Sequence, residues 1–279
     1  MNTRTTIILT ALLILLAACN EPTEAPRVEL PVVVDAGGLK AVTTDLGYQI
    51  EVTDARMAFK NLAFTIAGEL HTNETHAHSV WQTLSRALLP TAHAHPGHFG
   101  GGEVTGELPG EFVVDFFEDD GQQLGLATLL AGTYRGANFT FARASEEHLD
   151  PDDPLAGHTA IISGTATRNG TSTSFTIVLD SHDNRDLIGA PLTRADGTST
   201  GFQAHIDEHA TGSLAIQLLT EDPVELDTIF DGIDFDRLQT NPDGLANLGP
   251  QSLDDSADAY NLFRRTFQLA EHYIVYYQE

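Results

Sequence analysis

The chain has 279 residues, of which 41% are apolar and 19% charged, so it is long enough to bury a core and is not composed like a disordered chain. Its 40 Asp and Glu residues outnumber 14 Lys and Arg residues, giving a formal net charge of -26. This charge opposes binding to DNA, RNA or an anionic lipid surface. With one cysteine, the chain forms neither an internal disulfide nor a Cys-rich zinc module.

The first residues have the pattern of a secretory signal. Arg4 precedes an apolar run over residues 7–16, and two small residues, Ala17 and Ala18, follow the run. The apolar run is too short to cross a bilayer of ~30 Å. Residues 1–18 are therefore predicted to be a signal peptide.

The cysteine lies directly after this signal. Residues 16–19 read Leu-Ala-Ala-Cys and resemble the lipobox of bacterial lipoproteins. The resemblance implies that Cys19 is acylated and anchors the protein to a membrane in the bacterial envelope. Because Asn20 rather than Asp follows, it implies the outer membrane, facing the periplasm or the cell surface. Residues 19–31, rich in Pro and Glu, are predicted to form a flexible tether.

Short runs of alternating or β-branched apolar residues dominate the rest of the chain. The clearest pattern spans residues 158–179, where two such runs flank Asn169-Gly170, a pair suited to a tight hairpin turn. Further strands are predicted at residues 48–52, 62–66, 112–116, 139–141, 202–206 and 213–219. Many short strands with few helices predict an all-β fold, an antiparallel β-sandwich in one domain over residues 32–279.

Apolar residues at intervals of three and four predict two helices. The first is a short helix within a His-rich loop at residues 71–102, from the spacing of Val80, Trp81, Leu84, Leu88 and Leu89. The second is a C-terminal helix that packs on the sandwich, from the spacing of Tyr260, Phe263, Phe267, Ile274 and Tyr277.

The His-rich loop carries the chemistry that the sequence indicates. His76 with His78, and His93 with His95, form two His-x-His units, each of which presents two imidazoles on one face of an extended backbone. Neutral imidazoles at ~2.0–2.1 Å form zinc or copper sites without thiolates. The predicted metal ligands are His76, His78, His93 and His95, with His98 and His71 as further candidates. The alternative is a solvated loop that binds metal weakly, without a defined site.

A second candidate set lies at residues 205–209. If a strand continues from residue 202 to residue 209, His205, Asp207 and His209 share one face and could bind zinc, iron or manganese. Alternatively, they form the polar outer face of an exposed strand.

Two segments resemble a known family. Residues 129–141 (LLAGTYRGANFTF) and 56–64 (RMAFKNLAF), together with the signal, are similar to MbnP-like periplasmic copper-binding β-sandwich proteins. The resemblance implies a periplasmic metal-binding sandwich, but it transfers no ligand positions.

These patterns predict an envelope lipoprotein that binds Zn²⁺ or a copper ion through the His-rich loop, for capture or delivery rather than turnover. An envelope metal transporter is the partner that such a role implies. Metal release is expected below about pH 6, because imidazoles protonate there. Two alternatives stay open: a structural or glycan-binding envelope lipoprotein with incidental histidines, and a metal-dependent hydrolase with a metal-bound water.

Overall fold

The computed structural model describes residues 25–66, 104–145, 149–150, 152–181, 185–195 and 201–279. Their strands are β1 (Arg27–Val34), β2 (Val42–Thr43), β3 (Gln49–Thr65), β4 (Val104–Asp115), β5 (Gln123–Leu130), β6 (Gly132–Tyr134), β7 (Gly136–Phe141), β8 (Ala160–Arg168), β9 (Thr171–Leu179), β10 (Asp186–Arg194), β11 (Ala204–Ile206), β12 (Ser213–Leu218), β13 (Leu245–Leu248) and β14 (Tyr273–Gln278). The α-helix in these residues is α3 (Asp254–Phe267), and the 3-10 helices are η1 (Ala36–Gly38), η2 (Phe235–Arg237) and η3 (Ala270–His272).

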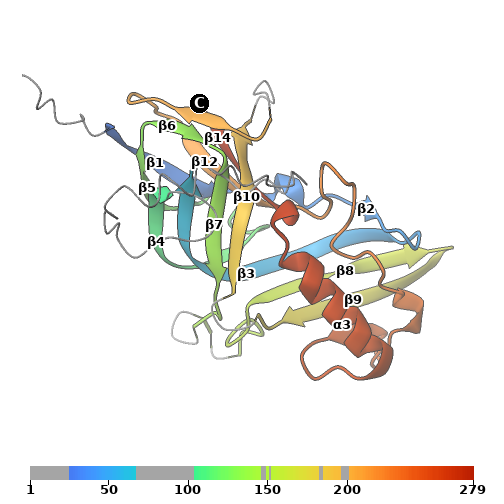
Figure 1. The fold of residues 1–279 in the computed structure, drawn as a ribbon. Helices are drawn as coiled ribbons and strands as arrows, with labels where there is room; N and C mark the ends of the chain where they lie inside the picture. The colour runs from blue at the N-terminus through green and yellow to red at the C-terminus, as the bar shows by residue number, and fades with distance from the viewer. Residues whose placement is uncertain (1–24, 67–103, 146–148, 151, 182–184, 196–200) are drawn as a thin grey trace, which may run out of the picture.

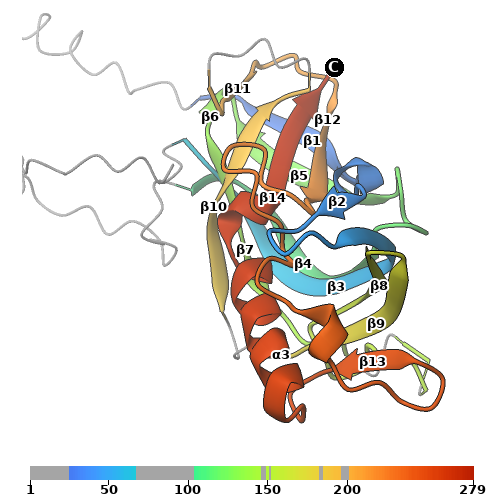
Figure 2. The same ribbon diagram turned by 90° about the vertical axis from the view of Figure 1, so that its right-hand side faces the viewer.

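The main sheet closes on itself. Its strands follow the order β3, β4, β5, β1, β12, β14, β10, β7, and β7 pairs again with β3, which gives an eight-stranded barrel (Figures 1 and 2). The predicted antiparallel β-sandwich is therefore wrong. In addition, two pairs of neighbouring barrel strands are parallel rather than antiparallel: β1 with β12, and β10 with β14. Sandwiches and barrels both bury alternate residues of each strand, so the burial pattern alone does not distinguish them.

Strand β3 is long enough to belong to two parts of the sheet. Gln49 to Met57 pair with β8, whereas Phe59 to Thr65 pair with β7 and thereby close the barrel. The pairing register shifts on both sides of β3 near Asn61, whose φ is 57°. Asn tolerates this left-handed conformation better than most residues, and such a bulge bends and twists a strand.

Beyond the barrel, the sheet continues from β3 through β8, β9 and β13 (Figure 2). The predicted hairpin is confirmed here: β8 and β9 pair in continuous register from Ala160 with Leu179 to Arg168 with Thr171. Asn169 and Gly170 have φ values of 53° and 82°, as the predicted turn requires. Helix α3 lies along this part of the sheet in Figure 2.

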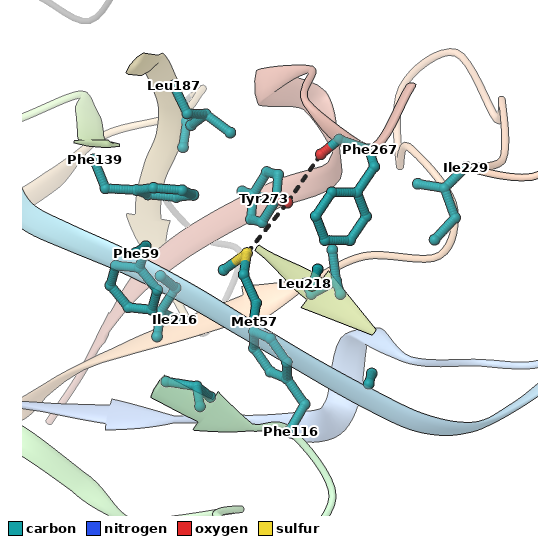
Figure 3. Packing of buried hydrophobic residues seen from close by; sticks show 14 of the residues in the cluster. Met57, Phe59, Phe116, Phe139, Leu187, Ile216, Leu218, Ile229, Phe267 and Tyr273 are labelled. Atoms are coloured by element: carbon teal, nitrogen blue, oxygen red, sulfur yellow. Dashed lines mark hydrogen bonds between the residues drawn. The ribbon is translucent and has the colours of Figure 1, made fainter. Parts of the chain in front are cut away.

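One apolar core runs from the barrel to the face of α3 (Figure 3). Tyr273 of β14 is fully buried, and its hydroxyl donates a hydrogen bond of 2.9 Å to the carbonyl oxygen of Phe267. The same hydroxyl lies 3.6 Å from the sulfur of Met57 on β3. The barrel and the helix are thus joined by one packed interior.

Both ends of the domain differ from the sequence prediction. At the N-terminal end, β1 begins at Arg27, inside the predicted tether 19–31, because Val28 and Leu30 alternate inward with Val32 and Val34. At the C-terminal end, a helix is confirmed over Tyr260, Phe263 and Phe267, but it ends at Phe267. Ile274 and Tyr277 lie instead in β14, where the residues alternate between buried and partly buried positions.

No helix in the described residues has the length and apolar composition needed to cross a membrane.

Candidate functional site

The candidate site is the end of the barrel at which β3 ends and β4 begins, on either side of residues 67–103. Thr65 of β3 and Val104 of β4 are partners in the antiparallel register. On its other side, Thr65 pairs with Gly136, the first residue of β7, and its hydroxyl donates a hydrogen bond of 3.3 Å to the Gly136 carbonyl. Thr65 is fully buried, so this end of β3 is fixed within the sheet.

A tyrosine stabilises the same end from inside. The hydroxyl of Tyr134 lies 2.7 Å from the carbonyl oxygen of Leu130 and 3.1 Å from that of Thr105. The ring is fully buried, and burial raises the pKa of the phenol above its ordinary value. Tyr134 therefore stays neutral and links β4 to the chain between β5 and β7.

The small two-stranded sheet of β6 and β11 lies at this end as well (Figure 2). Its register sets His205 opposite Thr133, and Thr133 precedes Gly136 by three positions. The Thr133 hydroxyl lies 3.1 Å from Nδ1 of the exposed His205 ring. With the proton on Nδ1, the hydroxyl accepts the hydrogen bond and Nε2 keeps a free lone pair. Histidines that bind metals have this arrangement, in which the second nitrogen bonds to a neighbouring oxygen.

The other two members of the predicted 205–209 set do not share a strand face with His205. Strand β11 ends at Ile206, and the chain turns through residues 207–210, where the Ala210 amide donates to the Asp207 carbonyl at 3.2 Å. The Asp207 carboxylate accepts a hydrogen bond of 2.7 Å from the His209 backbone amide, and the His209 ring is largely exposed. The strand predicted at residues 202–206 is present as β11 but does not continue to residue 209, because Asp207 closes a turn there.

The remaining predicted site residues lie outside the described part of the chain. These are Cys19, the predicted signal peptide 1–18, the short helix with Trp81, and the six histidines His71, His76, His78, His93, His95 and His98. Among the residues that the structure does describe, no group of three or more His, Cys, Asp or Glu side chains is arranged to hold a metal ion. His205, Asp207 and His209 are therefore the predicted ligands that the structure describes.

A second cluster of polar side chains lies at the opposite end of β3. The Tyr48 hydroxyl donates to Asp234, and the Arg168 guanidinium carbon lies 4.1 Å from the centre of the Tyr48 ring. Burial and the bond to Asp234 raise the pKa of Tyr48 to about 12. The acceptance of this hydrogen bond lowers the pKa of Asp234. The groups satisfy one another, which marks the cluster as structural.

Comparison of the chain with protein-family models, with curated proteins and with solved structures finds no match. The resemblance to MbnP-like proteins stays a prediction from residues 56–64 and 129–141. In the structure, these segments are the bulged part of β3 and the run from the end of β5 through β7, which pair with each other.

Proposed function

We propose that this protein is a lipid-anchored envelope protein, attached through Cys19, that captures or delivers a transition metal ion, zinc or copper. The observation that carries the proposal is the pair of His-x-His units at residues 76–78 and 93–95. Imidazoles at this spacing need no thiolate to bind zinc or copper, and this chain has one cysteine.

The geometry of the barrel end supports this proposal in two ways. Thr65 and Val104 are register partners, so residues 67–103 are an insertion between neighbouring strands of a rigid sheet. His205, through Thr133 and Gly136, belongs to the same end of the barrel as Thr65. A histidine that bonds to a hydroxyl through Nδ1 offers Nε2 as one further ligand.

The place where the described chain begins also supports the proposal. The carbonyl of Pro26 accepts a hydrogen bond of 2.7 Å from the amide of Ala131, next to β6. The described chain therefore starts at the end of the barrel that carries His205. A metal captured there would be held on the side of the protein from which its tether leaves.

Equilibrium dialysis of the chain from residue 19 onward against Zn²⁺ and Cu²⁺ tests the proposal. We expect binding at pH 7.5 that weakens at least tenfold at pH 5, since imidazoles protonate below about pH 6. Replacement of His76, His78, His93 and His95 by Ala should remove tight binding of both ions.

The matched control is His158→Gln. His158 bonds to Asp180 at 2.6 Å and lies two residues before β8, which pairs with the half of β3 away from Thr65. This variant should bind metal as the parent does. Equal binding by the four-histidine variant and the parent would contradict the proposal, and so would an affinity that does not change between the two pH values.

A further inference from the structure

A cavity of about 670 Å³ lies beside α3, at the start of β10, and its walls carry an unusual concentration of positive charge for this chain. Arg185 comes from the residue before β10, whereas Arg264 and Arg265 come from the last turn of α3. The side chains of Asn261 and Gln268 line the same cavity. Three of 14 cationic residues therefore gather at one place in a chain of net charge -26.

Within the described part of the chain, these three arginines differ from five others in having no ionic partner. The guanidinium groups of five arginines lie 3.9 Å or less from a carboxylate: Arg56, Arg143, Arg168, Arg194 and Arg237. Among the residues that the structure describes, no carboxylate forms a salt bridge with Arg185, Arg264 or Arg265, although acidic residues are nearly three times as numerous as basic ones. Their positive charge is therefore not neutralised by a close carboxylate, although Arg265 also lines a neighbouring pocket that holds several acidic residues.

A buried amide gives a second, independent indication. Gln268 is 6% exposed, and its Nε2 atom has no hydrogen-bond partner among the described residues. An unsatisfied buried donor is destabilising, so native proteins usually satisfy such groups with water, an ion or a ligand. Gln268 is also one of the residues that line the cavity.

The positions of Arg264 and Arg265 have a simpler explanation, since cationic side chains stabilise the negative end of a helix dipole. That explanation does not extend to Arg185, which belongs to another element, or to the buried amide of Gln268. The gathering of Arg185 with Arg264 and Arg265 around one cavity is explained if the cavity receives a group that is negatively charged and accepts several hydrogen bonds. Phosphate and carboxylate groups have these properties, and arginine binds them with two parallel hydrogen bonds.

We propose that this cavity binds a small soluble molecule that carries phosphate or carboxylate groups. Its volume falls in the range of small-molecule sites, roughly 300–1,000 Å³. A free anion fits better than an anionic membrane surface, because the many carboxylates elsewhere on the protein would repel such a surface. The site is separate from the metal-binding end of the barrel and does not depend on the function proposed for it.

Calorimetric titration of the full mature chain at low ionic strength, with pyrophosphate and with citrate as ligands, tests this proposal. Arg185→Gln and Arg265→Gln should each weaken binding of the preferred anion about tenfold, which is the loss of one charge-assisted contact. Asp258 lines the same cavity and repels an anion, so Asp258→Asn should tighten binding. Thermal unfolding of each variant checks that the fold is kept.

The matched control is Arg237→Gln, which makes the same change in net charge at an arginine that pairs with Asp255 at 3.2 Å and does not line the cavity. It should leave the affinity unchanged. Equal losses in Arg237→Gln and in the cavity variants would overturn the proposal, because they would show a general charge effect. Absence of binding by both anions, or binding only to vesicles that contain anionic lipid, would also overturn it.

Discussion

The phenol of Tyr48 donates a hydrogen bond of 2.5 Å to the carboxylate of Asp234. These residues are far apart in the sequence, and their bond joins the start of β3 to the chain before η2. The Tyr48 oxygen also accepts a hydrogen bond of 3.0 Å from the Asp236 amide. Arg168, at the end of β8, covers the Tyr48 ring and bonds to Asp236 at 2.6 Å. The cluster therefore holds residues 234–236 against the start of β3 and the end of β8.

Tyr48→Phe should lower the free energy of unfolding by about 1–2 kcal/mol, because it removes both hydrogen bonds of the hydroxyl and keeps the buried ring. Urea denaturation measures this loss. A double-mutant cycle with Asp234→Asn should give a coupling energy of at least about 0.5 kcal/mol, as expected for groups in one network. Additive effects of the two substitutions would show that the hydrogen bond contributes nothing to stability.

The same bond predicts a dependence on pH. It lowers the pKa of Asp234, so its contribution is present above the ordinary carboxyl pKa of about 4 and is lost as the pH falls through the lower pKa of the folded state. The stability difference between the parent and Tyr48→Phe should therefore shrink at the acid end of a urea series. A difference that grows with acidification would contradict this assignment.

Local patterns in the sequence predict local structure well in this protein. The hairpin of β8 and β9 depends on neighbouring residues and on the two turn residues Asn169 and Gly170, so its pattern is complete within 22 residues, 158–179. The alternation of Ser213 to Leu218 likewise predicts β12. In both cases the burial of a strand face follows from the residues of that strand.

The closure of the barrel was not predictable in this way, because it depends on pairs that are distant in the chain. Strand β3 was predicted as two strands, at residues 48–52 and 62–66. Its middle loses alternation where Met57, Ala58 and Phe59 are all buried, since Ala58 packs against a second small cluster on the outer side of the sheet. Every residue of β7 is buried, which gives no periodicity that identifies its two neighbours.

The sequence predicted only part of the candidate site. His205 was named from the sequence, but Thr133 was not, since the contact between them depends on the pairing of β6 with β11. The cavity beside α3 was also missed. The adjacent arginines at 264 and 265 were its one signal in an acidic sequence, and Arg185 joins them through the fold alone.

The close approach of β8 to β3 predicts that Gly164 does not tolerate a side chain. A Cβ atom at Gly164 would lie 2.4 Å from the carbonyl oxygen of Glu51 and 2.9 Å from the ring of Phe175. Gly164→Ala should therefore cost about 1–3 kcal/mol, the usual range for overpacking. In Gly132→Ala, the nearest atom to the new Cβ would be 4.0 Å away, so thermal unfolding should show little change. Similar losses in both variants would contradict so close an approach of the two strands at Gly164.

His272 should make the fold sensitive to mild acid. The ring is 2% exposed, and burial lowers its pKa, although nearby carboxylates oppose the shift: Asp222, Glu271, Asp227 and Asp231. In the unfolded chain, His272 takes up a proton near pH 6.5, whereas in the folded chain it does so at a lower pH. Stability therefore falls as the pH drops below about 6.5. His272→Leu should reduce the loss of stability between pH 7 and pH 5 in urea denaturation. An unchanged pH dependence would show that His272 does not contribute to it.

The hydroxyl of Thr133 should influence metal binding through His205. If His205 supplies a ligand at the metal-binding end of the barrel, His205→Ala should weaken zinc or copper binding. Thr133→Val should weaken it about tenfold, because loss of a hydrogen bond to a ligating imidazole typically lowers affinity by about 10–100-fold. In the variant that already lacks His205, Thr133→Val should have no further effect, since the hydroxyl acts through that ring. Equilibrium dialysis of the two single variants and the double variant measures this dependence. Independent losses from the two substitutions would mean that Thr133 acts on the fold of this end rather than on the imidazole.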